Sequence, residues 1–323
     1  MVLYKRWCAL CCLLACPGLA WSADLLRIGT QKFAHYGAVS YMKVLGPRYG
    51  LRIEERVFAK GIDINPALVA GAVDVSASAA DAAIAGRAAG VPIVVVAGFA
   101  KGGARMVVRQ GLKLGSIRDL RGRTVGVARG GAQELLLLAE LAQAGLTWSE
   151  KPGKDVLIFY MQFADLNAAL MAGDIDAMCQ SEPQSSQAIN QGFGTELLKP
   201  YDTPLGEPVR TLVMTEKLLK ERPAVARRAM RCFLEATRAF LRHPELAEDY
   251  VRRQMFKGQI SRQDYQDALA NSPFTPDITV EHIQTTTDLM KRYGVGRMAS
   301  PPRAVDWVRL DLLHQVKREM GWR

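Results

Sequence analysis

Several short polar or glycine-containing segments follow apolar stretches of the sequence, at points where strands are expected to end. They contribute amide, ammonium, imidazole, guanidinium and hydroxyl side chains together with glycine backbone amides. These groups donate hydrogen bonds, and backbone N–H groups at the start of a helix favour negative charge. The chemistry they indicate is the binding of a sulfonate, carboxylate or phosphate. The candidate ligand contacts are Gln31, Lys32, His35, Tyr36, Ser76, Ser78, Arg129, Gly130, Gly131, Ala132, Gln162, Phe163 and Glu182.

Each candidate also has a structural interpretation. Ser78 suits a helix N-cap. Gly130 and Gly131 fit a tight turn as well as the close approach of a ligand to the backbone. Arg129 is typical of a surface or lobe-closing residue, and Glu182 could accept from an amine or cap a helix. Aromatic residues at strand ends suit either stacking on an aromatic ligand or the core, and here they are Phe33, Tyr36 and Phe163.

Motifs for catalysis are not found in the sequence. It contains no G-x-S-x-G, H-E-x-x-H or paired C-x-x-C, and its four histidines lack metal-ligand spacing. Cys179 is the only cysteine near a candidate loop. We therefore expect no catalytic residue, no metal site and no cofactor.

The elements that must position the candidates alternate between strand and helix patterns. Apolar segments at 25–30, 51–58, 73–76, 91–96, 124–128 and 156–163 predict strands, with helical segments between them. Such alternation predicts an α/β fold with mostly parallel sheets. In open parallel sheets, ligands bind beyond the carboxyl ends of the strands, which is where the candidate residues are expected.

One ten-residue segment is written twice, at 65–74 (N-P-A-L-V-A-G-A-V-D) and 167–176 (N-A-A-L-M-A-G-D-I-D). Its Asn suits a helix N-cap, and its Gly suits the left-handed position after a helix. The flanking strands and helices repeat as well. A single long period predicts two similar lobes, although βα units can also resemble each other by chance.

Glycine- and proline-containing segments mark the crossings between the lobes. Residues 101–105 form a flexible connector, 202–208 form a candidate return connector, and the pattern from 216 onward is helical. We expect these last helices to pack mainly on the first lobe. The predicted division is lobe 1 at 24–102 plus 216–323 and lobe 2 at 103–215.

Residues 1–23 have the pattern of a secretory signal peptide. Lys5 and Arg6 precede a short apolar core, and small residues suit cleavage before Ala23 or Asp24. Leu13-Leu14-Ala15-Cys16 also resembles a lipobox, but Pro17 and the short core favour soluble export. No apolar run reaches the length of a membrane span. We expect Cys179 and Cys232, the cysteines beyond this leader, to be unpaired and buried.

The net charge is +10, and removal of the leader leaves +8. A basic exported protein suits an anionic ligand or an acidic partner surface. The basic residues are dispersed, without a nucleic-acid-binding motif, which argues against a nucleic-acid partner. We expect a monomer.

Several motifs occur in a particular order: R-I-G, A-L-x-A-G-x-x-D, G-V-P-I-V-V-V-A-G-F, D-L-R-G-R-T-V-G-V, a second A-L-x-A-G-x-x-D and S-E-P. This order resembles the periplasmic substrate-binding proteins of the sulfonate/nitrate/taurine and thiamine-precursor type (NMT1/THI5-like). The resemblance implies a type II two-lobed fold, a two-stranded hinge, a small-molecule ligand in the cleft, and delivery of that ligand to an ABC permease in the inner membrane.

Two alternatives remain at this stage. The chain could be a periplasmic ligand sensor or accessory binding protein that works without a permease. It could also be an enzyme built on the same fold. The resemblance extends to desulfinases, which use a cleft cysteine, but 31–37 contains none. It also extends to pyrimidine-precursor synthases, whose clustered-cysteine motif is absent.

Overall fold

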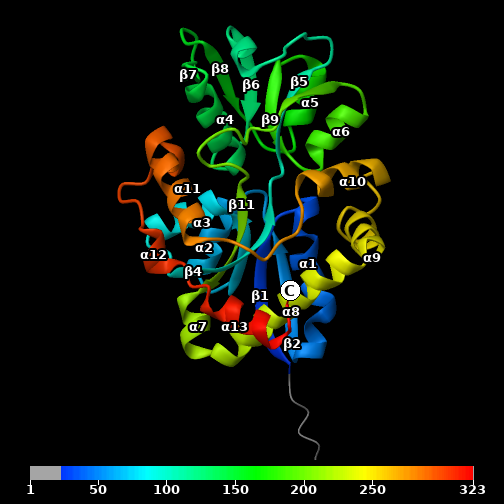
Figure 1. Cartoon of the computed structure of the whole chain (residues 1–323), viewed down its shortest axis with the longest axis vertical. Coiled ribbons are helices and arrows are strands. Elements are labelled where there is room, and N and C mark those ends of the chain that lie inside the picture. Colours follow the sequence, from blue (N-terminus) through cyan, green and yellow to red (C-terminus); the bar gives the residue numbers. More distant parts are fainter. Residues whose placement is uncertain (1–22, 323) are drawn as a thin grey trace, which may run out of the picture.

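The computed structural model describes residues 23–322. The predicted leader and the lipobox-like Cys16 therefore lie outside the described residues, apart from Ala23. The described chain forms two sheets stacked along its long axis, each flanked by helices (Figure 1). The first sheet has five strands in the order β2 (Leu51–Val57), β1 (Asp24–Thr30), β3 (Val75–Ala79), β11 (Val209–Thr215) and β4 (Ile93–Lys101).

The second sheet repeats this plan. Its order is β10 (Gly194–Leu198), β5 (Ala104–Arg109), β9 (Ala177–Ser181), β6 (Arg123–Val127), β8 (Val156–Tyr160) and β7 (Trp148–Ser149). Only β11 in the first sheet and β5 in the second run antiparallel to both neighbours. The remaining pairings are parallel. The predicted two-lobed α/β fold with mostly parallel sheets is confirmed.

The helices cover both faces of these sheets. Leu26 and Ile28 of β1 share a buried cluster with Met42 of α1 and Phe233 of α8. The helices are α1 (Gly37–Leu45), α2 (Ile64–Val69), α3 (Ala80–Ala88), α4 (Ala132–Gln143), α5 (Leu166–Ala172), α6 (Gln184–Asn190), α7 (Glu216–Glu221), α8 (Pro223–Arg242), α9 (Pro244–Asp249), α10 (Arg262–Asn271), α11 (Val280–Tyr293), α12 (Ala304–Trp307) and α13 (Asp311–Glu319).

The repeated segments make the same hydrogen bonds in both lobes. Asp74 accepts from the Arg27 backbone N–H at 2.9 Å, and Asp176 accepts from the Thr124 backbone N–H at 3.1 Å. Each aspartate thereby ties its segment to an interior strand of its own sheet, β1 or β6. The repeat seen in the sequence is therefore a repeat of structure.

The repeated asparagines are not N-caps, which corrects the prediction. Asn65 and Asn167 lie inside α2 and α5. Their side-chain amides instead donate to the carbonyls of Ala82 (3.2 Å) and Gln184 (2.9 Å), which belong to the following helix in each lobe. An amide can satisfy its hydrogen bonds at a distant carbonyl as well as at its own helix end, and local sequence cannot decide between them.

The repeated glycines do occupy the left-handed region that was predicted. Gly71 has φ 66° and Gly173 has φ 86°. The strands that follow begin later than expected, at Val75 and Ala177.

Two short connectors join the lobes. Gly102 and Gly103 link β4 to β5 with φ of 68° and 76°. The Gly102 N–H donates to the Pro208 carbonyl of the return connector at 2.8 Å. The predicted boundary at residue 215 needs a correction, because β11 pairs with β3 and β4 of the first sheet. The chain therefore returns to the first sheet before Val209, and the division into lobes otherwise stays our proposal.

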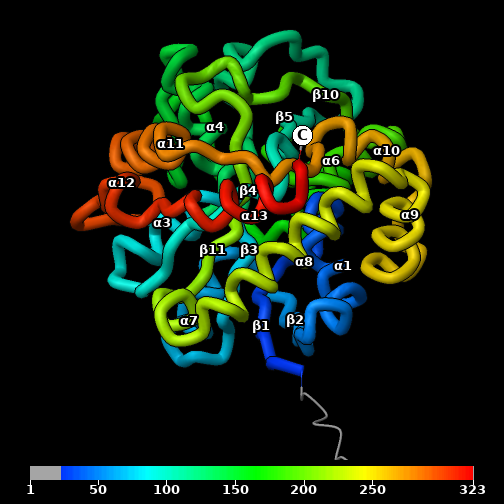
Figure 2. Tube along the Cα trace, turned by 60° about the horizontal axis from the view of Figure 1, so that its bottom comes forward, coloured from blue at the N-terminus to red at the C-terminus, as the bar shows by residue number. Residues whose placement is uncertain are grey.

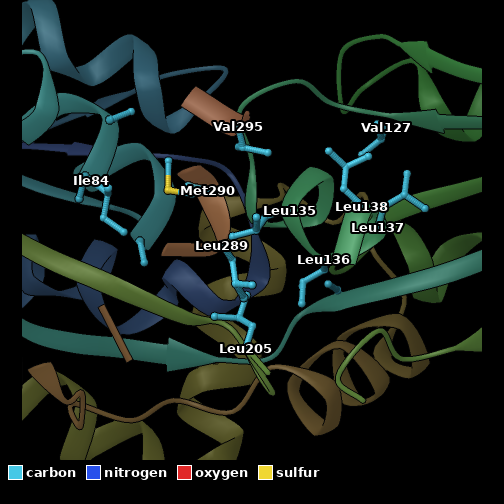
Figure 3. Close-up of a cluster of buried hydrophobic side chains, with 14 of the residues drawn as sticks. Ile84, Val127, Leu135, Leu136, Leu137, Leu138, Leu205, Leu289, Met290 and Val295 are labelled. Carbon is cyan, nitrogen blue, oxygen red and sulfur yellow. The ribbon is translucent and has the colours of Figure 1, made fainter. Parts of the chain in front are cut away.

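The C-terminal helices pack mainly on the first lobe, as predicted, while α10 and α11 also reach the second (Figures 1 and 2). Leu289 and Met290 of α11 belong to the same buried cluster as Leu135 and Leu136 of α4 (Figure 3). On the other side, the Asn190 amide of α6 donates to Asp264 and Asp267 of α10, each at 3.0 Å. An apolar contact and a polar contact therefore bridge the lobes on opposite sides.

The last predicted helix, 304–320, is divided into α12 and α13. Between them, Val308 forms a parallel bridge with Val95 of β4, and the Arg309 N–H donates to the Val95 carbonyl at 2.9 Å. The backbone at Val308 and Arg309 pairs with the edge strand β4, so it does not continue the helix between α12 and α13.

Two further sequence predictions concern the two cysteines and membrane-spanning helices. Cys179 and Cys232 are buried and unpaired, as predicted. Between residues 23 and 322, no helix combines the length and the apolar character needed to cross the bilayer.

Candidate functional site

A cavity lies between the two sheets, at the carboxyl ends of their parallel strands. From the first lobe it is lined by the segments after β1 and β2, by the start of α3 and by β11. From the second lobe it is lined by the segments after β6 and β8 and by the end of β9. Its lining residues are Gln31, Phe33, His35, Tyr36, Lys60, Gly61, Ala79, Ala82, Arg129, Gly130, Gly131, Gln133, Phe163, Ser181 and Arg210. Its volume is 20 Å³, room for roughly one water-sized group.

Arg210 is a buried cation at this cavity. It lies on β11 next to the connectors and is 2% exposed. Its Nη2 donates to the Gly102 carbonyl at 3.1 Å, and its Nε donates to Nε2 of His35 at 3.3 Å. Nη1 is buried and has no hydrogen-bond partner. A buried guanidinium with one free donor and no paired carboxylate is costly, which makes it a strong candidate for binding an anion.

His35 supplies a second free donor. A guanidinium nitrogen can only donate, so Nε2 of His35 must be the unprotonated nitrogen of a neutral ring. The proton of that ring is then on Nδ1, which is buried without a partner. Burial, with a smaller contribution from the charge of Arg210, holds the pKa of His35 well below its ordinary value. The ring therefore remains a neutral donor over the physiological range.

Aromatic rings enclose these donors. The Phe33 ring is stacked on His35, with centroids 5.7 Å apart, and it meets Phe163 of the second lobe edge-on at 5.3 Å. Tyr36 donates its hydroxyl hydrogen to Oε1 of Gln31 at 2.7 Å. The Phe33–Phe163 contact joins the lobes directly across the cavity, so the two lobes are close together here.

The start of α4 forms the upper wall. Gly130 has φ 74°, a conformation that glycine adopts without strain. Its N–H donates to Oε2 of Glu134 at 2.6 Å. This amide already has a carboxylate partner within the chain, and the positive φ of Gly130 suits the predicted tight turn. Gln133 donates to the Gly103 carbonyl at 3.3 Å and so ties α4 to the connector.

Arg129 has partners of its own at the edge of the cavity. Its guanidinium lies 3.5 Å from the centroid of the Tyr160 ring and forms a 2.7 Å ion pair with Glu150. Both partners belong to the second lobe, so these contacts suit a surface residue of that lobe.

Asp81 is a buried acid near the same cation. It lies in the first turn of α3, is 2% exposed, and its Oδ1 has no hydrogen-bond partner. Burial raises the pKa of Asp81 to about 7, although the positive charge of Arg210 acts in the opposite direction. The charge state of this part of the cleft therefore changes near neutral pH.

The cavity brings together many of the predicted residues: Gln31, His35, Tyr36, Arg129, Gly130, Gly131 and Phe163. The others lie outside its lining. Lys32 is exposed and contacts Gln259 at 3.4 Å. Gln162 is exposed as well, and Ala132 is the first residue of α4.

The remaining predicted residues are buried in strand β3 or in the turn before α6. Ser76 and Ser78 lie inside β3, paired with β11. Glu182 is completely buried, accepts from the Ser186 hydroxyl at 2.7 Å, and forms an ion pair with Arg105 at 3.0 Å. Burial raises the pKa of Glu182. Of its two predicted roles, the contact with the start of α6 corresponds to the capping of a helix.

Sequence reasoning did not select Lys60, Gly61, Gln133, Ser181 or Arg210. The signal for Arg210 was present, because it is the only charged residue in the otherwise apolar and hydroxyl-bearing strand V-R-T-L-V-M-T. A lone arginine in a buried strand needs a partner, and that need could have identified it. No group of three or more His, Cys, Asp or Glu side chains within residues 23–322 is arranged to hold a metal ion.

The chain is similar to several known proteins. The model of the NMT1-like family matches residues 26–253. A protein of Escherichia coli (strain K12) named as an aliphatic sulfonates-binding protein is 31% identical over 186 residues, which are 55% of each chain. The chain thus spans about half the length of this curated relative.

Solved structures share the fold over nearly the whole chain. The alkanesulfonate-binding protein of Xanthomonas axonopodis pv. citri bound to MOPS has a TM-score of 0.75 at 19% identity, covering 89% of this chain and 98% of that one. The periplasmic nitrate-binding protein of Synechocystis PCC 6803 has a TM-score of 0.75 at 18% identity, covering 93% and 90%. At these identities the likeness establishes the fold, which is that of type II periplasmic binding proteins.

Proposed function

The chain belongs to the NMT1-like family, and from that premise we propose that it is an extracytoplasmic solute-binding protein for a small organic anion. The ligand binds in the cavity between the two sheets, and the protein delivers it to an ABC permease in the inner membrane. Its relatives support this role, because one is named for sulfonate binding and another for nitrate binding.

The observation that carries the proposal is the pair of free donors at the cavity. Arg210 Nη1 and His35 Nδ1 are both buried, and neither has a partner within the chain. A buried donor without a partner costs roughly 1–3 kcal/mol, and more when it is charged. An oxyanion that accepts from both donors removes that cost and also balances the charge of Arg210. A neutral solute leaves the charge of Arg210 unbalanced, and a cationic solute opposes it.

The contacts between the lobes support capture by closure. The Phe33–Phe163 contact and the bonds from Asn190 to α10 hold the two lobes together around a cavity of 20 Å³. A ligand of several atoms enters only when the lobes separate. Because it contacts both lobes only in the closed arrangement, it stabilises that arrangement.

Binding suits this site better than catalysis. Cys179, the single cysteine near the predicted loops, is completely buried. Burial raises the pKa of its thiol far above the ordinary range, so the reactive thiolate is scarce. The histidine of the cavity is held neutral by burial and, to a smaller degree, by the charge of Arg210, and its unprotonated nitrogen is occupied by the Arg210 guanidinium.

A thermal-shift screen tests the proposal. The panel contains alkanesulfonates, taurine, nitrate, aromatic carboxylates and pyrimidines, each with wild type, Arg210→Gln and the exposed control Arg52→Gln. A ligand at 100 times its Kd stabilises the folded protein by about 2.7 kcal/mol. We expect at least one anion to stabilise wild type and the control but not Arg210→Gln. Stabilisation by neutral compounds alone, or turnover of any compound, would contradict the proposal.

Uptake assays separate transport from sensing. Cells that lack this protein are compared with complemented cells for uptake of the anion found in the screen. Loss of uptake supports delivery to a permease, and unchanged uptake favours the sensor alternative.

A further inference from the structure

A second, larger chamber adjoins the cavity. Its volume is 280 Å³, and it shares Lys60, Arg129 and Gly130 with the lining of the first cavity. Its outer wall is the turn after α11, which contributes Gly294, Gly296 and Arg297. Both lobes form this chamber, because the start of α4 is one of its walls.

Two cations of the chamber lack partners. Within residues 23–322, neither Lys60 nor Arg297 forms an ion pair or a side-chain hydrogen bond. Arg129, by contrast, is paired with Glu150. Of the two carboxylates that line the chamber, Glu134 accepts from the Gly130 N–H, and Asp63 is exposed to solvent. Lys60 and Arg297 are therefore free to bind a ligand.

The backbone at Arg297 is held in an unfavourable conformation. Arg297 has φ 48°, in the left-handed region that residues other than glycine, asparagine and aspartate rarely adopt. The preceding Gly296 also has a positive φ, of 76°. Glycine would adopt this backbone conformation without strain. The presence of arginine at 297 is therefore better explained by a function of its side chain. Strained residues of this kind cluster at ligand-binding sites.

We propose that the chamber binds the second acidic group of an elongated di-acid, whose first acidic group lies at Arg210 and His35. This inference rests on the proposed function and narrows its ligand class. The first cavity has room for roughly one water-sized group, so the rest of a ligand must extend toward the shared wall at Lys60 and Arg129. The distal acid then meets Lys60 and Arg297, while a ligand that ends in a methyl group leaves both unsatisfied.

Isothermal titration with matched ligand pairs tests the inference. The probes are α,ω-dicarboxylates from succinate to suberate and propane-1,3-disulfonate, each compared with the mono-acid of the same carbon number. We expect at least one di-acid to bind wild type about tenfold more tightly than its mono-acid, a difference of about 1.4 kcal/mol. In Lys60→Gln/Arg297→Gln the pair should differ by less than about twofold, and Arg210→Gln should weaken both members of the pair.

Arg297→Gly separates a ligand role from a structural one. Glycine relieves the left-handed strain, so we expect the Tm to stay equal or rise while the di-acid preference falls. Equal affinity within every pair, or a di-acid preference that survives in the double variant, would overturn the inference. If Arg210→Gln still weakened the binding of the mono-acids in that case, the proposed function would stand. Binding of no acid at all would overturn both.

Discussion

Arg210 donates from Nε to Nε2 of His35 across 3.3 Å, and this contact decides which nitrogen of each side chain stays without a partner. It leaves His35 with its proton on Nδ1 and leaves Arg210 with one free nitrogen, Nη1. The two residues are 175 positions apart in the sequence, on β11 and in the segment after β1. Their donors are available together only because β11 returns to the first sheet.

Arg210→Gln should separate binding from stability. Hydrogen bonds to charged groups are worth about 1.5–3 kcal/mol, so we expect the Kd for the anion to rise roughly 10- to 100-fold. The Tm should stay equal or rise, because the variant removes a buried charge that has no ion-pair partner. Titration calorimetry and thermal melts measure the two quantities. A large loss of Tm with unchanged affinity would assign Arg210 to the scaffold.

Asp81 should make stability depend on pH in the direction opposite to that of a salt-bridged acid. Its pKa is about 7 in the folded chain, against about 3.9 when unfolded. Between these values the folded state binds more protons, so its stability falls as the pH rises from about 4 to 7, and the loss persists above 7. Asp81→Asn should therefore raise the Tm more at pH 8 than at pH 4. An equal effect at both pH values would exclude this acid as the source.

The same acid should also affect binding. Above pH 7 the negative charge of Asp81 opposes that of Arg210, so affinity for an anion should fall with rising pH in wild type. Asp81→Asn should flatten this dependence, while His35, held neutral, contributes little to it. Titrations at pH 5.5 and pH 8.5 in both proteins compare the slopes.

Asn190→Asp should weaken closure of the cleft. The Asn190 amide uses its two hydrogens on Asp264 and Asp267, and the substitution sets three carboxylates against one another. At this exposed site we expect a cost of about 1 kcal/mol, reduced by salt. The measurements are anion affinity and the radius of gyration in solution. Gln191→Glu adds the same charge at the next position and serves as the control.

Phe163→Ala should weaken closure in a way that salt does not change. The Phe33–Phe163 contact is the aromatic pair that joins the lobes at the cavity, and such pairs contribute about 0.5–1.5 kcal/mol beyond their buried area. We expect a several-fold loss of anion affinity at both low and high salt. The exposed Phe159 in β8, the strand that precedes Phe163, provides the control variant Phe159→Ala.

The sequence predicted most of the scaffold because its signals are local. Gly71 and Gly173 are left-handed as expected. The repeated segment indicated two similar lobes, and in the structure Asp74 and Asp176 make equivalent hydrogen bonds in the two lobes. The prediction for Asn65 failed because its partner, the Ala82 carbonyl, lies on the next helix.

The site was predicted only in part, because its decisive contacts are not local. Loops at strand ends are visible in a sequence, so the positions of His35, Gly131 and Phe163 were found. Ser76 and Ser78 also follow an apolar stretch in the sequence, but in the structure they lie inside β3, which pairs with β1 and β11. Arg210 stands out in the sequence as the only charged residue of its strand, but its position at the cavity depends on where β11 inserts in the first sheet.

Structure determination of the complex with the tightest-binding anion tests the central claim most directly. The claim predicts an anionic oxygen within hydrogen-bonding distance of both Arg210 Nη1 and His35 Nδ1, with Phe163 and the start of α4 closing over it. A ligand bound elsewhere, with both donors still unpartnered, would contradict it.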